Sequence, residues 1–149
     1  MLKLSRKTAL ALEAVLDVAY HARPDPVQAR DITARQGIPP RYLEQVLQHL
    51  VREGMLKGVR GPRGGYVLAR ERRRTTLGDV IRVVAKMDAG EEDVRLGPQL
   101  GAVLIAPIWQ AAEAEVMRRF DAVTLEDLCR AGQARGIALP DGTLPDFSI

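Results

Sequence analysis

The side chains best suited to chemistry in this sequence lie on one face of a predicted helix over residues 40–53. Polar and charged residues recur there at helical spacing, at Arg41, Glu44, Gln45, Gln48 and Arg52. Positions three, four, seven and eleven residues apart share one side of an α-helix. Glutamine and glutamate can hydrogen-bond the adenine and cytosine edges that DNA exposes in its major groove. Every surface helix has a polar face, so the neighbouring elements decide whether this one binds DNA.

Those neighbouring elements have the order of a helix-turn-helix. After a first helix over 7–22, a short helix is expected over 28–36, and Gly37 ends it. Pro39 and Pro40 then begin the 40–53 helix, because proline is tolerated in a first turn. Its second face is apolar and is predicted to pack in a core, through Leu43, Val46, Leu47, Leu50 and Val51. In a helix-turn-helix the second helix enters the major groove, which assigns that place to the 40–53 helix.

A hairpin is predicted directly after the 40–53 helix. Two β-like runs, 55–60 and 65–70, flank the sequence GPRGG at 61–65. A hairpin that follows a helix-turn-helix is a wing, with Arg60 at its base and Arg63 at its tip. Both arginines could reach phosphates or a narrow minor groove. The glycines match neither the dinucleotide nor the Walker spacing, so a nucleotide-binding loop is not expected.

Positive charge is concentrated in the half of the chain that contains these elements. Residues 1–74 hold 15 Lys and Arg against 7 Asp and Glu, a net charge of +8. Residues 75–149 hold 7 against 12, a net charge of −5, so the overall +3 conceals a strongly basic half. This asymmetry suggests a polyanion-binding part joined to a part with a different task.

The second half of the chain is predicted to dimerise. A helix to about Met87, an acidic loop to about Gln99 and a long helix ending near Ala122 follow one another. The long helix is expected to begin at Leu100 or Ala106. Its apolar residues present more surface than one small domain can cover: Trp109, Ala112, Val116 and Phe120. We therefore expect a DNA-binding domain over 1–75, a dimerisation and effector region over 76–135 and a loose tail over 136–149. The expected fold is mainly α with a small β wing: a winged helix-turn-helix domain plus a long C-terminal dimerisation helix.

The composition argues against several other classes of protein. With Cys129 as its one cysteine, the chain cannot form an internal disulfide, and His21 and His49 alone supply little for zinc or catalysis. The sequence shows no nucleophilic side chain paired with a general base, so an enzyme is not expected. The longest apolar run, 101–109, contains a proline and falls short of the ~18 residues of a membrane span. A cytoplasmic protein without membrane contact is expected.

Several stretches resemble one family of bacterial transcription regulators, the Rrf2 family. They are LEAVLDVA, ITARQGIPPRYLEQVLQHLVREG, VRGPRGGYVLAR and VTLEDL, all within about residues 1–130. The resemblance implies a winged helix-turn-helix, a long dimerisation helix and a homodimer on palindromic double-stranded DNA. It also implies that Glu44 and Gln45 face base edges, that Arg60 enters the minor groove and that Tyr42 is the aromatic residue of the recognition helix. Arg41 stands where some members have serine, so the half-site could differ.

One departure from the family pattern affects the expected cofactor. Sensor members have three cysteines in the loop before the long helix and a histidine just before its tryptophan. Here residues 88–98 contain neither Cys nor His, and Ala106 precedes Pro107-Ile108-Trp109. Cys129 lies outside that loop, and iron–sulfur clusters need several thiolates. We therefore expect a member without a cluster, metal or other cofactor, with Glu91, Glu92 and Asp93 simply solvated.

The predicted function is a sequence-specific DNA-binding transcriptional regulator, a repressor, acting as a homodimer on a palindromic operator. The alternative is a winged-helix module that binds a protein partner through its acidic half and binds DNA only weakly. Glutamines and a glutamate on the 40–53 helix favour the first, because protein-binding faces more often present apolar anchors. An effector, either a small molecule or a protein, is expected at the 88–98 loop or beside Trp109.

Overall fold

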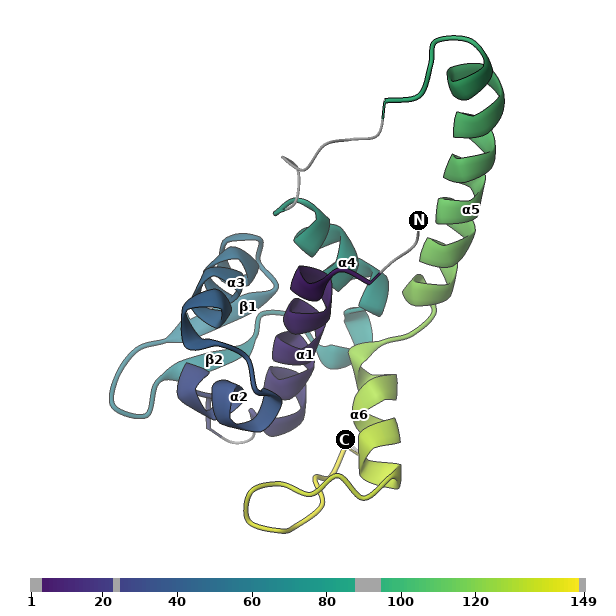
Figure 1. Ribbon diagram of the computed structural model, residues 1–149. Coiled ribbons are helices and arrows are strands. Elements are labelled where there is room, and N and C mark those ends of the chain that lie inside the picture. Colours follow the sequence, from purple (N-terminus) through teal and green to yellow (C-terminus); the bar gives the residue numbers. More distant parts are fainter. Residues whose placement is uncertain (1–3, 23–24, 88–94, 148–149) are drawn as a thin grey trace.

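The structure is a computed structural model that describes residues 4–22, 25–87 and 95–147. Figure 1 shows α1, α2, α3 and a two-stranded hairpin grouped on one side, while α5 projects from the other. The elements are α1 (Arg6–His21), α2 (Ala29–Gln36), α3 (Pro40–Arg52), β1 (Leu56–Val59), β2 (Gly65–Leu68), the 3₁₀ turn η1 (Arg72–Arg74), α4 (Leu77–Ala85), the π-helix η2 (Leu100–Ile105), α5 (Ala106–Asp121) and α6 (Leu125–Ala134). This mainly helical chain with a small antiparallel sheet confirms the predicted fold class.

Local signals explain where the first three helices begin and end. Ser5 caps α1 by accepting a hydrogen bond from the Thr8 backbone N–H, at 3.1 Å. Gly37 ends α2 with φ of +67°, a left-handed conformation that glycine adopts without a steric penalty. Pro40 occupies the first turn of α3, where its missing N–H breaks no helical bond. The turn between α2 and α3 is therefore encoded in the chain itself.

A single apolar core holds α3 against α1. The buried side of α3 packs with buried residues of α1 in one cluster, which includes Ala11, Val15, Val18, Leu43, Val46, Leu47 and Leu50. Small side chains on α1 allow close approach, and the larger leucines of α3 fill the space between the helices. Burying each leucine stabilises the fold by about 2 kcal/mol relative to leaving it exposed.

The hairpin is attached to the loop that follows α1. Leu56 pairs with Leu68 and Val59 with Gly65, so residues 60–64 form the tip. Val27 adds a bridge to Tyr66: each backbone N–H donates to the other residue's carbonyl, at 3.0 and 2.7 Å. A Cβ at Gly65 would lie 2.4 Å from the Val27 carbonyl oxygen, so only glycine permits this approach. The base of the wing is thus fixed to the helical body.

Helices α4 and α6 begin side by side with the same type of cap. Thr76 forms a capping box with Asp79, and Thr124 forms one with Asp127. Thr76 and Thr124 also pair in an antiparallel bridge, and the Leu125 N–H donates to the Thr75 carbonyl at 2.9 Å. These bonds join the residues after the wing to the start of α6.

The π-helix η2 continues directly into α5 and makes one long exposed helix. Leu100–Asp121 is, by length and composition alone, apolar enough to span a membrane, and none of it is buried. The sequence predicts no membrane span, because its longest apolar run, 101–109, contains Pro107 and is shorter than ~18 residues. In the structure Pro107 occupies the first turn of α5, where proline is tolerated. The loop predicted before this helix falls partly on residues 88–94, which lie outside the described residues.

The end of the chain corrects one prediction, because residues 136–147 are not a loose tail. Phe147 is only 1% exposed, with its ring centroid 5.3 Å from that of Tyr20 and 4.5 Å from the Arg72 guanidinium carbon. Gln133 Nε2 donates to the Pro145 carbonyl at 2.6 Å, and the Tyr20 hydroxyl donates to the Ile137 carbonyl. Figure 1 shows this segment looping below α6 and returning beside it. Prolines and glycines there shape a docked segment rather than a disordered one.

A buried ionic cluster fixes α2 to α1. The carboxylate of Asp17 is fully buried and accepts hydrogen bonds from Arg35 Nε at 2.9 Å, Arg35 Nη2 at 2.7 Å and Gln36 Nε2 at 2.8 Å. This bonding raises the pKa of Arg35, so its guanidinium stays charged. Since α2 sets the angle at which the chain enters α3, the cluster helps to orient α3.

Replacing Asp17 with alanine should therefore destabilise the fold. We expect Asp17→Ala to lower the free energy of unfolding by about 3 kcal/mol, because Arg35 is left partly buried without its counter-charge. Urea denaturation followed by circular dichroism measures this loss. Glu13→Ala, at an exposed position of the same helix, is the matched control and should change stability by about 0.5 kcal/mol or less. Equal losses in the two variants would contradict this role for Asp17.

Candidate nucleic-acid interface

Core packing decides which side of α3 meets the solvent. Leu43, Val46, Leu47 and Leu50 are buried, so the opposite side is directed outward. All five predicted polar residues of α3 are exposed there: Arg41, Glu44, Gln45, Gln48 and Arg52. Gln48 Nε2 lies 3.4 Å from Glu44 Oε1, a weak hydrogen bond between successive turns. Arg52 lies about 16 Å along the axis from Arg41, at the far end of the helix.

A basic residue that was not among the predicted DNA-binding residues lies beside the start of α3. Arg6, at the start of α1, lines a shallow hollow of about 400 Å³ together with Pro39, Arg41, Tyr42 and Gln45. No side chain caps α3, so its first backbone N–H groups are open to an anion such as a phosphate. The adjacent basic pair Arg6 and Lys7, at the start of a helix, was the available signal. In the sequence this pair was counted only in the net charge of residues 1–74.

The wing presents its two arginines on a turn that glycines make possible. Gly61 has φ of +111°, and the Gly64 N–H donates to the Gly61 carbonyl at 2.9 Å. A Cβ at Gly64 would lie 2.2 Å from the Val59 carbonyl oxygen, so a larger residue could not form this tip. Arg60 and Arg63 are exposed, and within the described part of the chain neither forms an ion pair. Their charges are available to a polyanion.

The recognition helix and the wing form one positively charged surface. Figure 1 shows α3 and the hairpin next to each other, on the side away from α5. The exposed charged residues of α3 and the hairpin are mostly cations: Arg41, Arg52, Lys57, Arg60 and Arg63, against Glu44. Arg6 of α1 lies beside Arg41 and adds to them. A protein that neutralises DNA phosphates with such cations gains affinity by releasing counterions. This arrangement suits a duplex in which α3 enters the major groove and the wing reaches the adjacent backbone or minor groove.

Helix α3 is also bonded to α4 on the other side of this surface. His49 Nε2 lies 2.9 Å from the Val83 carbonyl oxygen, which makes it a structural residue. Lys86 Nζ donates to Glu53 Oε2 at 2.8 Å, and this bond lowers the pKa of Glu53. Arg82 on α4 in turn donates to both carboxylate oxygens of Asp121, at 2.7 and 2.6 Å. A chain of polar contacts therefore runs from α3 through α4 to the end of α5.

The predicted dimerisation residues lie on α5 but differ in exposure. Trp109 and Ala112 are exposed, and the indole N–H of Trp109 donates to Glu113 Oε1 at 2.9 Å. Val116 and Phe120 are half-buried within this chain. A larger apolar surface lies nearer the start of the helix, on residues that sequence analysis did not single out: Leu100, Val103, Leu104, Ile105 and Ile108. The sequence left two possible starts for this helix, Leu100 and Ala106, so these residues were not predicted to form part of its apolar surface.

Comparisons with known proteins place this geometry in a family. A family model described as Rrf2, "Iron-dependent Transcriptional regulator", matches residues 4–131. The protein rrf2 of Nitratidesulfovibrio vulgaris is 32% identical over 132 residues, covering 87% of this chain and 88% of the relative. The regulator IscR of Xenorhabdus nematophila is 34% identical over 139 residues, covering 92% and 85%.

Two solved structures have the same fold. The IscR of T. potens superposes with a TM-score of 0.73 at 31% identity, covering 94% of this chain and 95% of that one. The CymR of B. subtilis, whose structure is described as that of a global cysteine regulator, gives 0.71 at 29% identity, covering 88% and 98%. Both similarities therefore extend over most of this chain.

The iron in the family description does not fit the residues of this chain. An iron–sulfur cluster needs several thiolates, whereas Cys129 is the single cysteine and is buried in the core. Among the described residues, no three His, Cys, Asp or Glu side chains come together as metal ligands. The acidic residues Glu91, Glu92 and Asp93 lie outside the described residues, and no Cys or His accompanies them in the sequence. We assign no cluster-dependent step to this chain.

The family assignment rests on sequence and structure together. The matched range contains the helix-turn-helix, the wing, α5 and the first half of α6. The family model and the IscR relative are both named as transcriptional regulators rather than as enzymes. The resemblance inferred from the sequence is confirmed, and the chain belongs to the Rrf2 family of transcriptional regulators.

Proposed function

We propose that this regulator acts as a homodimer that binds a palindromic operator and represses transcription. The observation that carries the proposal is the exposed polar face of α3, held beside the wing arginines by a buried core. Two such surfaces on a symmetric dimer would face two half-sites on successive turns of the duplex. Operator binding by such a dimer is sufficient for repression, because a bound dimer excludes RNA polymerase from the same DNA. We place the protein in the cytoplasm, in contact with chromosomal DNA.

Different side chains would contribute differently to binding. Glu44 and Gln45 lie on the exposed face of α3, where their carboxylate and amide can pair with cytosine and adenine. Gln48 lies one turn further on and extends the same face. Arg41, Arg52 and Arg6 would contact phosphates, which position the helix without specifying sequence. Arg60 at the wing base would enter a narrow minor groove, and Arg63 would contact the backbone.

A second copy of this chain is the partner that the exposed side of α5 requires. Five large apolar side chains between Leu100 and Ile108 are more than half exposed, and Trp109 continues the same helix. A monomer rarely exposes such a contiguous patch. We infer that two α5 helices pack against each other, with Trp109, Ala112, Val116 and Phe120 along the contact. The dimer then sets the spacing between the two recognition helices.

The alternative function, a protein-binding winged helix with weak DNA affinity, has less support. In such a module α3 would not read bases, and an α3 that bound protein would more often present apolar or aromatic anchors. Val51 is the one large apolar residue of α3 that is exposed, and it lies at the end away from Tyr42. The acidic C-terminal half remains available to a protein effector in either case.

Base-reading and phosphate-binding residues should be separable by mutation. Glu44→Ala and Gln45→Ala should each cost about 1–3 kcal/mol on an operator selected from random DNA and relax preference at one position. Arg63→Ala should weaken binding to all sequences alike and lower the salt dependence by about one counterion per protomer. Fluorescence anisotropy against operator and random duplexes, at several salt concentrations, measures both effects. Glu13→Ala is the control, and an equal loss on both duplexes for every variant would refute these roles.

A charge in the exposed patch of α5 should separate the dimer. Ile108 is 71% exposed, so Ile108→Glu should leave each chain folded but place two carboxylates in the proposed contact. Light scattering should show a monomer, and affinity for a two-half-site operator should fall to that for a single half-site. Gln110→Glu adds the same charge on a different side of α5 and should stay dimeric. A wild-type protein that is monomeric at micromolar concentration would rule out the dimer.

A further inference from the structure

The end of α5 is joined to α4 at a place that the proposed DNA contacts do not use. Helix α4 belongs to the winged-helix body, because Val80 and Val84 are buried in the same core as α1 and α3. Helix α5 projects from that body, and its exposed apolar start lies at the far end (Figure 1). The α4–α5 joint therefore connects the DNA-binding surface to the inferred dimer contact. Its residues are Leu77, Gly78, Arg82, Asp121 and Val123.

Two separate attachments hold α5 at this joint. The Leu77 backbone N–H donates to the Val123 carbonyl at 2.8 Å, just beyond the end of α5. Arg82 Nη1 and Nη2 donate to the two carboxylate oxygens of Asp121, at 2.7 and 2.6 Å. Leu77 and Arg82 are about 7.5 Å apart along the axis of α4. One attachment would act as a pivot, whereas two attachments at different points fix the angle between the helices.

Gly78 makes the close approach of the two helices possible. A Cβ at Gly78 would lie 1.9 Å from Asp121 Oδ1 and 3.2 Å from Arg82 Nη1. A larger residue would therefore displace the carboxylate that Arg82 bonds. Paired hydrogen bonds between a guanidinium and a carboxylate also fix the relative orientation of the two groups. The position of Asp121 thus depends on both neighbours.

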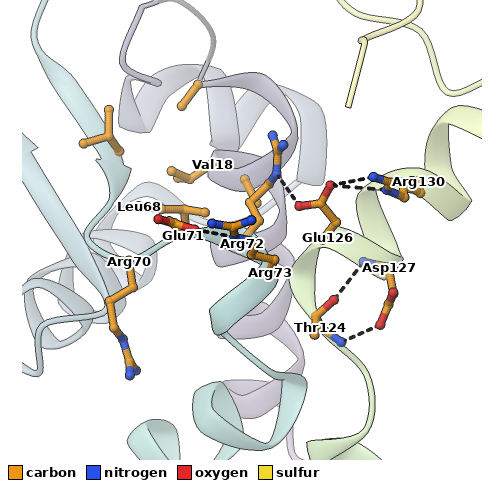
Figure 2. A pocket seen from close by; sticks show the side chains of 13 residues that line it. Val18, Leu68, Arg70, Glu71, Arg72, Arg73, Thr124, Glu126, Asp127 and Arg130 are labelled. Carbon is orange, nitrogen blue, oxygen red and sulfur yellow. Dashed lines mark hydrogen bonds and ion pairs between the residues drawn. The ribbon is translucent and has the colours of Figure 1, made fainter. Parts of the chain in front are cut away.

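The chain beyond α5 is fixed to the winged-helix body as well. Figure 2 shows Thr124 and Asp127 bonded to each other at the start of α6, and Glu126 paired with Arg72. Because Arg72 belongs to η1, directly after the wing, this ion pair holds α6 to the body. The short link 122–124 therefore has a fixed end, and the direction of α5 depends on its contact with α4.

We propose that Gly78, Arg82 and Asp121 make this regulator selective for one spacing between its two half-sites. The inference rests on the proposed function, in which the apolar start of α5 forms the dimer contact. Ile108, in that contact, lies about 20 Å along α5 from Asp121. Over that length a change of about 10° at the joint displaces the winged helix by about 3.5 Å, close to the rise of one base pair. Each added base pair also rotates one half-site by about 35°, which a fixed joint cannot follow.

Loss of the Arg82–Asp121 pair should change this angle without unfolding the chain. The two side chains are 51% and 38% exposed. Exposed ion pairs contribute little to the free energy of unfolding, because water solvates the separated charges well. The pair is therefore expected to act on geometry rather than on stability.

Paired spin labels measure the joint directly and without DNA. The labels are placed by Glu13→Cys on α1 and Gln110→Cys on α5, both exposed positions, whereas the native Cys129 is buried. Dilution with unlabelled chains restricts the measured distances to one chain. The distance distribution should be narrow in the parent protein. Asp121→Ala and Gly78→Ala should each shift or broaden it by about 3 Å, as a change of about 10° does at that distance from the joint.

Operators that differ only in half-site spacing measure the consequence for DNA binding. A half-site selected from random DNA is repeated as a palindrome, and the distance between centres is varied in steps of one base pair. A dimer that engages both half-sites gains about 10²–10⁴ in affinity over one half-site, and gains nothing where geometry forbids it. The wild type should show this gain at one spacing. In Asp121→Ala and Gly78→Ala its preference over neighbouring spacings should fall by about tenfold, with single half-site affinity unchanged.

Glu115→Gln is the matched control, because Glu115 pairs with Arg118 inside α5 and so joins no two elements. It should behave as the wild type in both measurements. Label distances that Asp121→Ala and Gly78→Ala leave unchanged would overturn the proposal, and so would a wild-type spacing preference in both variants. Equal changes in Glu115→Gln would also overturn it. A wild type that binds two half-sites no better than one refutes the proposed function and with it the spacing preference, whereas the label distances still decide whether the pair fixes the angle of α5.

Discussion

The packing of the apolar side of α3 against α1 is the constraint on which the rest of this structure depends. A helix cannot bury one face without fixing the direction of the other, so four buried residues determine where Glu44, Gln45 and Gln48 point. Asp17 adds a second restraint, because its bonds to Arg35 and Gln36 hold α2 to α1. DNA recognition needs side chains placed to within a fraction of an ångström. Side chains on a packed helix are positioned more precisely than side chains on a loop.

The same core connects the DNA-binding surface to the C-terminal half. The bonds of His49 and Glu53 to α4, and of Arg82 to Asp121, link α3 to the end of α5. A dimer formed through α5 would therefore hold the two recognition helices through rigid elements. The docked Phe147 in turn joins the end of the chain to Tyr20 of α1 and to Arg72 of η1, the turn that follows the wing. Through both sets of contacts, a conformational change in the acidic C-terminal half can affect the basic DNA-binding half.

Periodicity and capping signals were sufficient to predict most of the fold. The heptad-like spacing of Leu43 to Leu50 predicted α3 and its two faces, and Gly37 and Pro40 placed the turn before it. The sequence could not show that Arg6 lies beside Tyr42, because that proximity arises from packing between distant segments. Phe147 was missed for a related reason: a single aromatic residue after prolines and glycines has no periodic pattern, although it docks firmly. The sequence left two possible starts for the long helix, Leu100 and Ala106, so the exposed apolar residues between these two positions were not predicted to contribute to its surface.

Genome-wide footprinting with purified, metal-free protein tests the central claim most directly, because it asks whether this fold alone selects DNA sites. The account predicts discrete protected sites with two-fold symmetric half-sites whose centres lie about 34–36 Å apart, or a multiple of that distance. Chelators and a change between oxidising and reducing buffer should leave the protection unchanged, since the chain has one cysteine and no cluster ligands near it in the sequence. Protection without any shared sequence, or protection that appears only after iron and sulfide are supplied, would contradict it.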